Sequence, residues 1–388
     1  MRFRISWLAI PVIAALAVCP RTSEADTSAA DSTKHGSSFS SSEDGWFDVS
    51  NFLDAKYGFL PILIPITEPA VGYGIAGALA FVDKPLGNRS AGFGRPNITM
   101  IGGLATENGT WGALLGDLRH WKGDRLQTLA GIVYASANLD FYGVGDETQV
   151  ESGLRYNLEP KGLLLRAKYR IGPKARVWAG LGYMYSATKV SFDAPDGTPG
   201  LPDYDEHSAI GGITPSLTYD SRDNFFTPLS GTYVDLTGRF FGPALGGEDV
   251  FQNAFIVAMQ YVPIKSALFL GIRGDGKASF GDAPFYMLPF ISLRGAPILR
   301  YQGKAVAQTE VEVRWQFWRR ISLVGFGGLG ATWNDVEHFD NQRTIETGGA
   351  GFRYELARHY GIHAGLDLAF GPDETAIYVQ MGNAWARP

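Results

Sequence analysis

Cysteine is almost absent from this chain, whose 388 residues include only Cys19. A single cysteine cannot form an internal disulfide, which excludes the disulfide-stapled folds of small secreted proteins. Two arginines precede an apolar run at 5–18, and a Ser-Glu-Ala triplet at 23–25 suits cleavage. We therefore predict a secretory signal peptide at residues 1–25, whose removal leaves a mature protein without cysteine.

The alternative for the N-terminus is a lipoprotein signal, with a lipid attached to Cys19. Residues 16–19 read Leu-Ala-Val-Cys, which resembles a lipobox in outline. Val18 directly before the cysteine and Pro20 after it fit that signal poorly. Both alternatives predict export from the cytoplasm.

Long apolar runs are also missing after the N-terminal stretch. A transmembrane helix needs about 18 or more predominantly apolar residues in a row. The stretch 60–82 comes nearest, but three prolines, Glu68 and several glycines interrupt it. In a membrane without spanning helices, only a closed β-barrel satisfies every backbone polar group. If the chain spans a membrane, that membrane is therefore the outer membrane of a Gram-negative bacterium.

Positive charge and catalytic motifs are scarce as well. The net charge of −5 argues against a nucleic-acid-binding protein. No Gly-x-Ser-x-Gly elbow and no cluster of metal-ligating residues is present. His359 and His363 are four apart, and a strand would separate them by roughly 13 Å, too far for one metal. We predict no enzyme activity, no cofactor and no metal; a lipid-facing Ser–His pair assembled from different strands is the alternative.

Glycine and aromatic residues are abundant by contrast. The chain has 49 Gly, 24 Phe, 17 Tyr and 9 Trp beside 19 % charged residues. Barrels use glycine where the backbone curves, and aromatic side chains suit girdles at the membrane surface. The Ser- and Asp-rich residues 26–56 predict a disordered leader. Within it, 46–57 forms either one short amphipathic helix or an irregular lead-in.

Strict alternation marks the stretch 304–318. Its even positions are polar or charged from Gln308 to Gln316, whereas its odd positions are mostly apolar and include Trp315 and Phe317. This period fits a β-strand, and its polar face carries too many charges for the core of a sandwich. It suits the water-filled lumen of a membrane barrel, with Trp315 and Phe317 at the lipid interface.

Similar segments, separated by turn residues, recur to the end of the chain. We count sixteen, an even number, as bacterial outer-membrane barrels require. We predict an all-β fold, a transmembrane antiparallel β-barrel over 57–388, with a soluble β-sandwich as the alternative. The predicted strands are 60–68, 71–82, 96–106, 110–120, 126–140, 155–171, 175–192, 207–220, 231–241, 250–262, 266–280, 304–318, 320–333, 346–356, 361–370 and 375–385.

The last predicted strand ends in a pattern typical of outer-membrane proteins. Ile377, Val379, Met381 and Trp385 alternate onto one face and end in an aromatic residue near the C-terminus. This resembles the C-terminal strand by which such proteins are recognised for assembly. Asn383 departs from the pattern, because an aromatic residue is more usual at that position.

A group of charges and turn residues follows the predicted strand 207–220. Proline and glycine turn the chain into the next strand, and the paired acids and arginine would fix a tight hairpin. Taken alone, the group could equally be an ordinary solvated turn. Its members are Asp220, Arg222, Asp223, Pro228 and Gly231.

This group combines with the Leu-Arg-Gly of 293–295 and a strand that contains Glu-x-Arg. The combination resembles the BamA/TamA-like superfamily of outer-membrane assembly barrels, the bacterial surface antigen family. The resemblance implies a long loop folded into the lumen, with Arg294 at its tip and Gly295 close to the barrel wall. It also implies Glu312 as the carboxylate partner of Arg294, with Glu310 as its substitute.

The strand 324–333 matches the family in part. Phe326 and Gly330 agree with the family pattern, but Gly328 stands where the family has Asp. Ala296 likewise occupies a position where the family prefers an aromatic residue. These departures predict that the loop is held more weakly, or by different partners.

Family members that assemble or secrete proteins usually carry periplasmic POTRA domains before the barrel. Residues 26–56 are too few for one, so the resemblance implies a POTRA-less member. A separate periplasmic protein would then deliver unfolded outer-membrane protein clients. Outer-membrane lipids would surround the barrel.

The resemblance implies a non-enzymatic factor that helps proteins or lipids insert into the outer membrane. Its first and last strands, 60–68 and 375–385, would meet at an imperfectly sealed seam, because prolines in the first strand lack an N–H. The alternatives are a passive channel or structural barrel plugged by the Arg294 loop and, as a third, a lipid-modifying enzyme. In a channel the following charges would line the pore: Arg166, Lys168, Arg170, Arg239 and Arg273.

Overall fold

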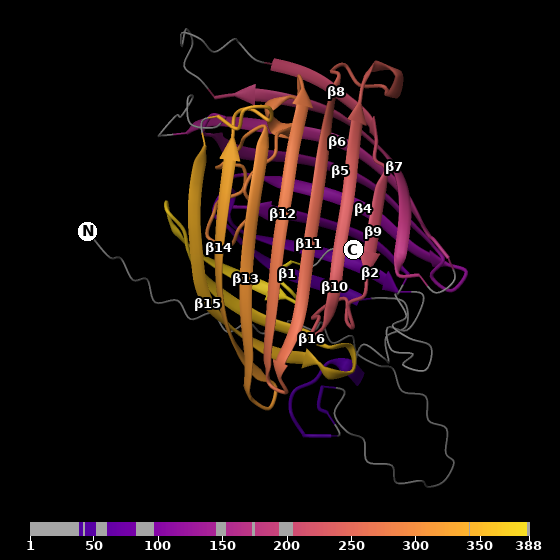
Figure 1. Cartoon of the computed structure of the whole chain (residues 1–388), viewed down its shortest axis with the longest axis vertical. Coiled ribbons are helices and arrows are strands. Elements are labelled where there is room, and N and C mark those ends of the chain that lie inside the picture. The colour runs from indigo at the N-terminus through magenta and orange to yellow at the C-terminus, as the bar shows by residue number, and fades with distance from the viewer. Residues whose placement is uncertain are drawn as a thin grey trace, which may run out of the picture. The chain divides into compact units, whose positions relative to one another are not determined.

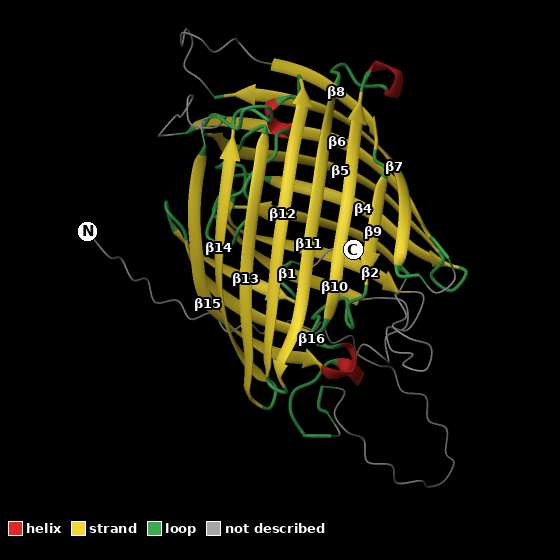
Figure 2. Ribbon diagram, in the orientation of Figure 1, coloured by secondary structure: helices red, strands yellow, loops and turns green. Residues whose placement is uncertain are grey.

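One antiparallel sheet dominates the computed structural model of the 388-residue chain (Figure 1). The structure describes residues 39–41, 43–51, 60–82, 97–144, 153–172, 175–193, 205–340 and 342–385. The predicted signal peptide with Cys19, and the first part of the predicted leader, lie outside the described residues. Strands make up most of the described part, and its named helical segments are short 3-10 turns (Figure 2).

No helix in this part of the chain is both long enough and apolar enough to cross a membrane.

The sheet contains 17 strands, each antiparallel to its neighbours. Their ends lie within a few residues of the predicted ranges, and the predicted all-β antiparallel fold is confirmed. The strands are β1 (Leu60–Glu68), β2 (Gly72–Val82), β3 (Ile98–Thr106), β4 (Trp111–Trp121), β5 (Leu126–Phe141), β6 (Leu154–Arg170), β7 (Val177–Phe192), β8 (Asp205–Ile213), β9 (Ser216–Asp220), β10 (Gly231–Phe241), β11 (Phe251–Lys265), β12 (Leu268–Gly281), β13 (Ala305–Trp318), β14 (Ile321–Trp333), β15 (Arg343–Ala357), β16 (Ile362–Phe370) and β17 (Thr375–Met381). The 3-10 turns are η2 (Pro243–Leu245), η3 (Phe285–Met287) and η4 (Arg358–Tyr360).

One interruption explains why 17 strands occupy the sixteen predicted places. Both β8 and β9 pair with β7 on one side and with β10 on the other. Between them, Pro215 has no N–H for the ladder, and Thr214 exchanges two backbone hydrogen bonds with Gly182 of β7. The predicted strand 207–220 is therefore one place in the barrel, divided at a proline.

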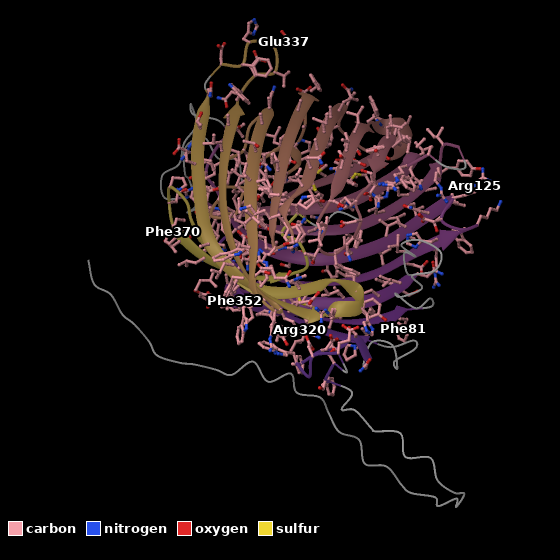
Figure 3. All side chains as sticks on the ribbon, turned by 60° about the horizontal axis from the view of Figure 1, so that its bottom comes forward. Phe81, Arg125, Arg320, Glu337, Phe352 and Phe370 are labelled. Carbon is pink, nitrogen blue, oxygen red and sulfur yellow. The ribbon has the colours of Figure 1, made fainter. Side chains whose placement is uncertain are left out.

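Alternation along each strand separates an outer from an inner side. On β13, Trp315 is 52 % exposed on the outer side, whereas Glu310 is 1 % exposed on the inner side. Phe352 and Phe370 lie at the outer margin of the barrel (Figure 3), and they are 46 % and 52 % exposed. Around a membrane barrel, such residues form the apolar belt that contacts lipid.

The inner side has two chemically different walls. We call the inner side of β10 to β16 the charged wall, because it carries Asp235, Arg273, Glu310 and Asp367. We call the inner side of β1 to β5 the apolar wall. The predicted polar lumen is therefore wrong for this half, whose strands are apolar on both sides. The apolar wall consists of Ile62, Ile64, Ile66, Ala76, Ala78, Ala80, Met100, Gly102, Leu104, Gly112, Leu114, Gly116, Leu118, Leu129, Gly131 and Val133.

Part of the predicted leader is ordered against the barrel. We call residues 39–41 and 43–51 the lead-in segment. Its Asp44 and Asp48 form ion pairs with Arg320 at 2.7 and 2.6 Å, and Arg320 is 1 % exposed. The hydrogen-bonded Arg320 guanidinium lowers the pKa of Asp44 to about 2. The lead-in is thus tied by charge to the turn between β13 and β14.

Aromatic contacts join the same two parts. Trp46 packs edge-on against Trp318, with ring centroids 5.1 Å apart, and Tyr354 donates a hydrogen bond to the backbone oxygen of Phe47 at 2.6 Å. The prediction of a disordered leader is wrong for the lead-in, because these contacts offset the entropy lost on ordering. Helical backbone begins at Ser50, and the rest of the possible short helix lies outside the described residues.

Candidate functional site

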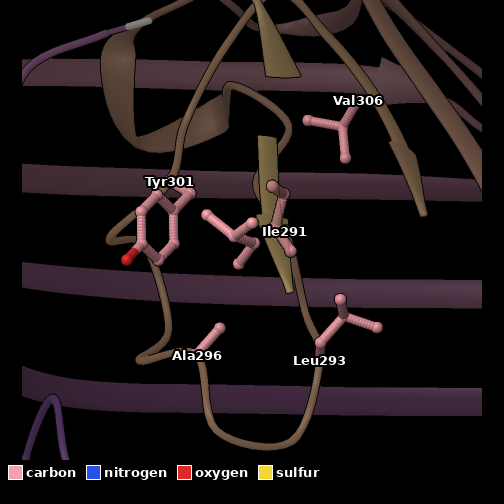
Figure 4. Packing of buried hydrophobic residues seen from close by; sticks show 6 residues of the cluster. Ile291, Leu293, Ala296, Tyr301 and Val306 are labelled. Carbon is pink, nitrogen blue, oxygen red and sulfur yellow. The ribbon is translucent and has the colours of Figure 1, made fainter. Parts of the chain in front are cut away.

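The connection from β12 to β13, residues 282–304, folds into the lumen. We call it the lumen loop. Its apolar side chains form a buried cluster with one residue of β13 and one of β15 (Figure 4). Apolar packing therefore holds the loop in place, in addition to the ion pairs of Arg294. The cluster comprises Ile291, Leu293, Ala296, Tyr301, Val306 and Ile345.

Arg294, near the tip of the lumen loop, lies among carboxylates from two strands. Its Nε donates to Glu310 Oε1 at 2.8 Å, and its Nη1 lies 2.8 Å from both Glu312 Oε2 and Asp367 Oδ2. Its Cζ lies 3.6 Å from the centre of the Phe326 ring. The side chain is 7 % exposed, so water screens these interactions little.

Asp367 is the partner that the sequence analysis missed. It is fully buried on the inner side of β16 and also forms an ion pair with Arg353 of β15. A signal was present, because Asp367 is the one acidic residue of the predicted strand 361–370. Asp367 supplies a carboxylate to Arg294, whereas Gly328, which stands where the family has Asp, has no side chain to do so. A Cβ at Gly328 would lie 3.1 Å from the Leu293 side chain, so the glycine makes room for the loop.

Close backbone approach accounts for two further glycines. Gly295 has a φ of +94°, and a Cβ there would lie 2.8 Å from the backbone oxygen of Phe370. Its N–H donates to the Tyr378 hydroxyl at 3.2 Å. On β14, a Cβ at Gly330 would lie 2.8 Å from Ile291 of the lumen loop. A side chain at either position would push the loop away from the wall.

The charged hairpin between β9 and β10 has its own ion pair. Arg222 donates from Nε and Nη2 to the two carboxylate oxygens of Asp220, each at 2.9 Å. The Arg222 guanidinium also lies 4.4 Å from the centre of the Tyr233 ring. Tyr233 belongs to a buried cluster with Met259, Tyr261 and Trp385.

The remaining hairpin residues shape the turn. Asp223 Oδ1 accepts hydrogen bonds from the backbone N–H groups of Leu229 and Ser230, at 2.9 and 3.2 Å. Pro228 lies between the two ends of this turn, and Gly231 begins β10 with a φ of +105°. The structure thus brings all five hairpin residues together in one turn.

Trp385 turns into the lumen and away from the lipid-facing side. Ile377 and Met381 are 50 % and 47 % exposed on the outer side of β17, but Trp385 is 3 % exposed. The chain changes direction at Gly382, whose φ is +77°. The predicted shared face is therefore wrong for Trp385, because the strand ends before it. The Trp385 Nε1 donates to Glu310 Oε2 at 2.5 Å.

Glu310 therefore links the lumen loop to the C-terminal segment. One carboxylate oxygen accepts from Arg294 of the lumen loop, and the other accepts from Trp385 of the C-terminal segment. We call Arg294, Glu310, Glu312, Asp367 and Trp385 the lumen lock. Through Trp385 and Tyr233, it is also connected to the charged hairpin.

The seam between the first and last strands differs from every other junction in the barrel. β1 and β17 lie beside each other, but they share no ladder of paired residues in the described part of the chain. β17 has 7 residues and β1 has 9, whereas β6 has 17. A spanning strand needs about 9–11 residues, so β17 is shorter than a spanning strand and β1 is at the lower limit.

Histidines and carboxylates form no obvious catalytic arrangement among the described residues. His363 faces the lumen, is 7 % exposed, and lies 3.3 Å from the backbone oxygen of Gly361. One group has ligand atoms close enough for a metal, namely Asp335, His338 and Asp340 in the connection from β14 to β15. This group is largely exposed, and such groups are common without a bound ion.

Comparison with solved structures finds the same fold in BamA and CdiB. BamA from Haemophilus ducreyi lacking POTRA domains 1–3 matches with a TM-score of 0.57 and 14 % identity, over 84 % of this chain and 69 % of that one. CdiB from Escherichia coli matches with a TM-score of 0.57 and 11 % identity, over 83 % of this chain and 61 % of that one. CdiB from Acinetobacter baumannii matches with a TM-score of 0.56 and 8 % identity, over 84 % and 59 %. At these identities the likeness establishes the fold.

Sequence comparisons give one further result. No curated protein matches the chain. Residues 118–293, from the end of β4 to the lumen loop, match the model of the Omp85 superfamily domain. Together with the barrel and its inward-folded loop, this match makes the chain similar to the Omp85 superfamily of outer-membrane β-barrels.

Proposed function

We propose that this barrel helps proteins or lipids insert into the outer membrane through the seam between β1 and β17. The missing ladder between these strands carries the proposal. The short β17 at the seam would thin and disorder the adjoining bilayer, which lowers the cost of inserting another barrel there. Unfolded outer-membrane proteins are the clients we expect, brought by a separate periplasmic protein.

Prolines explain why the seam is weak. Successive N–H groups of an antiparallel strand point alternately toward its two neighbours. β1 is paired with β2 along its whole length, so Pro61 and Pro65 place their missing N–H groups toward β17. Of the same alternate positions, only Leu63 and Thr67 can donate across the seam. Pro69, in the turn after β1, has no part in this ladder.

The lumen lock supports the same proposal from the other side. Arg294 is bound by β13 and β16, and Gly295 donates to Tyr378 of β17. The lumen loop is therefore anchored to the strands that lead to the seam. Anchoring keeps β16 and β17 in place. The loop also contacts the end of β1, where the Ile298 N–H donates to Glu68 Oε1 at 3.1 Å, so the rest of the β1 edge is the part that can separate.

An insertion assay tests the seam directly. We would follow the insertion of a small unfolded outer-membrane barrel into liposomes with and without the purified protein. We expect faster insertion with the protein, and a smaller increase with the double variant Pro61→Ile, Pro65→Ile, because its restored N–H groups pair the seam. Pro263→Ile, on β11 away from the seam, is the matched control. No acceleration by the folded protein would refute the proposal.

A passive channel is the second candidate, because the lumen loop lies inside the barrel and could act as its plug. Planar-bilayer conductance distinguishes the two functions. A channel predicts that Arg294→Ala raises conductance while the insertion rate stays at the level without protein. An insertion factor predicts that the same substitution slows insertion, because the strands that border the seam lose their anchor.

A further inference from the structure

The apolar wall faces the lumen without a cover at its centre. Leu104, Leu114 and Val133 of this wall point inward from β3, β4 and β5, yet they are 37 %, 38 % and 42 % exposed. Leu164 of the neighbouring β6 also points inward and is 37 % exposed. The lumen loop packs on the ends of β5 to β7 through residues such as Phe285, but it leaves these four uncovered. Apolar surface of this kind is unfavourable in water, so the wall requires an apolar partner.

The register of the ladders establishes that these residues point inward. Lys168 of β6 faces the lumen, because it lies 3.7 Å from Asp235 on the charged wall. Arg166, two residues earlier, shares that side, and it is paired with Leu129 of β5, which is paired with Leu118 of β4. Paired residues have their side chains on the same face of a sheet. The apolar wall is thus continuous with the charged residues of β6.

Two arginines of the described lumen form no ion pair, namely Arg166 on β6, beside the apolar wall, and Arg239 on β10. Among the described residues, Arg166 of β6 and Arg239 of β10 form no ion pair and no hydrogen bond. Asp235 lies near Arg166, but Lys168 and two threonine hydroxyls already engage its oxygens. Arg239 instead lies 4.5 Å from the centre of the Phe255 ring. Partly buried cations of this kind favour an anion in the lumen.

The two arginines lie at the same level of the barrel. Arg166 is paired with Gly182, and Gly182 is hydrogen-bonded to Thr214 in the interruption between β8 and β9. The backbone oxygen of Pro215, the residue after Thr214, accepts a hydrogen bond from the N–H of Gly238, which precedes Arg239. Three strand spacings, about 14 Å, therefore separate the two backbones. The small side chains of Gly182 and Thr214 leave space between the guanidinium groups.

We propose that the lumen binds an anionic amphiphile with a long acyl chain. The acyl chain lies along the apolar wall, and its carboxylate or phosphate head lies between Arg166 and Arg239. Charge and polarity change at the same border, β6, which matches a molecule with one apolar and one anionic part. The wall also begins at β1, so a lipid that passes the unpaired seam reaches it directly. The site is independent of protein insertion.

Native mass spectrometry of the purified full chain in a nonionic detergent tests this binding. Palmitate and palmitoyl lysophosphatidate would be compared with monopalmitoylglycerol, which has the same chain and no charge. We expect the two anionic probes to be retained, and their relative retention identifies the head group. The double variant Arg166→Gln, Arg239→Gln should weaken binding roughly tenfold or more, as expected when hydrogen bonds to charged groups are lost. Arg125→Gln, Arg155→Gln removes the same charge from exposed positions and should change nothing.

Two neighbouring residues of β4 locate the bound chain. Leu114 faces the lumen and Leu115 faces lipid, and they are 38 % and 44 % exposed. In a Cys19→Ser background, palmitate should slow alkylation of Leu114→Cys by a charged thiol reagent and leave Leu115→Cys unaffected. Native gel mobility would establish that each variant is folded.

Three results would overturn the proposal. The first is that no anionic probe is retained by the folded barrel. The second is that monopalmitoylglycerol binds as well as palmitate and that the double arginine variant binds both equally. The third is equal protection of the two cysteines, which would indicate detergent-like coating of the barrel. Faster or slower client insertion has no bearing on any of these readouts.

Discussion

At the scale of single residues, Arg294 and Glu310 depend on each other for burial. The Arg294 guanidinium neutralises carboxylates that would otherwise be buried together. The family resemblance was sufficient to identify Arg294, Glu310 and Glu312 as candidates. It could not identify Asp367, because β16 meets the loop tip only once the sheet has curled.

Arg294→Ala should destabilise the barrel strongly, because it leaves Glu310, Glu312 and Asp367 without their shared cation. Removing one partner of a buried ion pair costs about 3–5 kcal/mol. Urea unfolding, followed by gel mobility of the folded form, measures the change. Arg155→Ala is the control, since Arg155 is exposed outside the lumen. Equal unfolding midpoints for the two variants would show that the lumen lock does not stabilise the fold.

Trp385→Phe isolates the other half of the interaction with Glu310. The ring still fills the cluster with Tyr261, but the Nε1–H that Glu310 accepts is gone. A buried acceptor left unsatisfied costs about 1–3 kcal/mol, so we expect a loss of stability in that range. Trp315→Phe, on the lipid-facing side, should lose much less. A loss for Trp385→Phe no larger than that for Trp315→Phe would contradict the hydrogen bond.

At the scale of elements, the sequence predicted the positions of the strands well, but it did not predict the break within 207–220 or the order of the lead-in. The range 60–68 agrees with β1 because turn residues bound it clearly. The strand at 207–220 was predicted without its break, because a proline inside an alternating segment leaves the pattern of polarity intact. The lead-in was assigned to disorder from its composition. Its order depends on an ion pair with Arg320, which lies far along the chain. Local composition could not predict that contact.

The lead-in should detach from the barrel in acid. The pKa of Asp44 is lowered to about 2 from an ordinary value of 3.8, so docking contributes stability above pH 4 and loses it as the pH falls toward 2. Asp48 shifts in the same direction. Pepsin, which is active in this range, should cleave near Trp46 increasingly between pH 4 and pH 2. In Arg320→Gln, cleavage should be fast throughout. Fast cleavage of the unmodified chain already at pH 4 would contradict the docking.

At the scale of the whole molecule, the barrel is asymmetric. Its C-terminal strands carry the lumen loop and the charged wall, and its N-terminal strands carry an apolar wall that ends at the seam. The sequence predicted the barrel from the alternating strands, of which 304–318 is the clearest. It could not predict the apolar wall, because a strand such as β4, with Leu114 inside and Leu115 outside, shows no alternation. The inner side became apparent only from the register of neighbouring strands.

The bond between Trp385 and Glu310 also sets an order of events. Arg294 can reach its carboxylates only after β13 and β16 have formed, and Glu310 receives its second donor only from the segment that follows β17. A chain cut before Trp385 therefore cannot complete this centre. The segment after β17 becomes buried only when the strands before it are in place, so its burial marks the completed barrel.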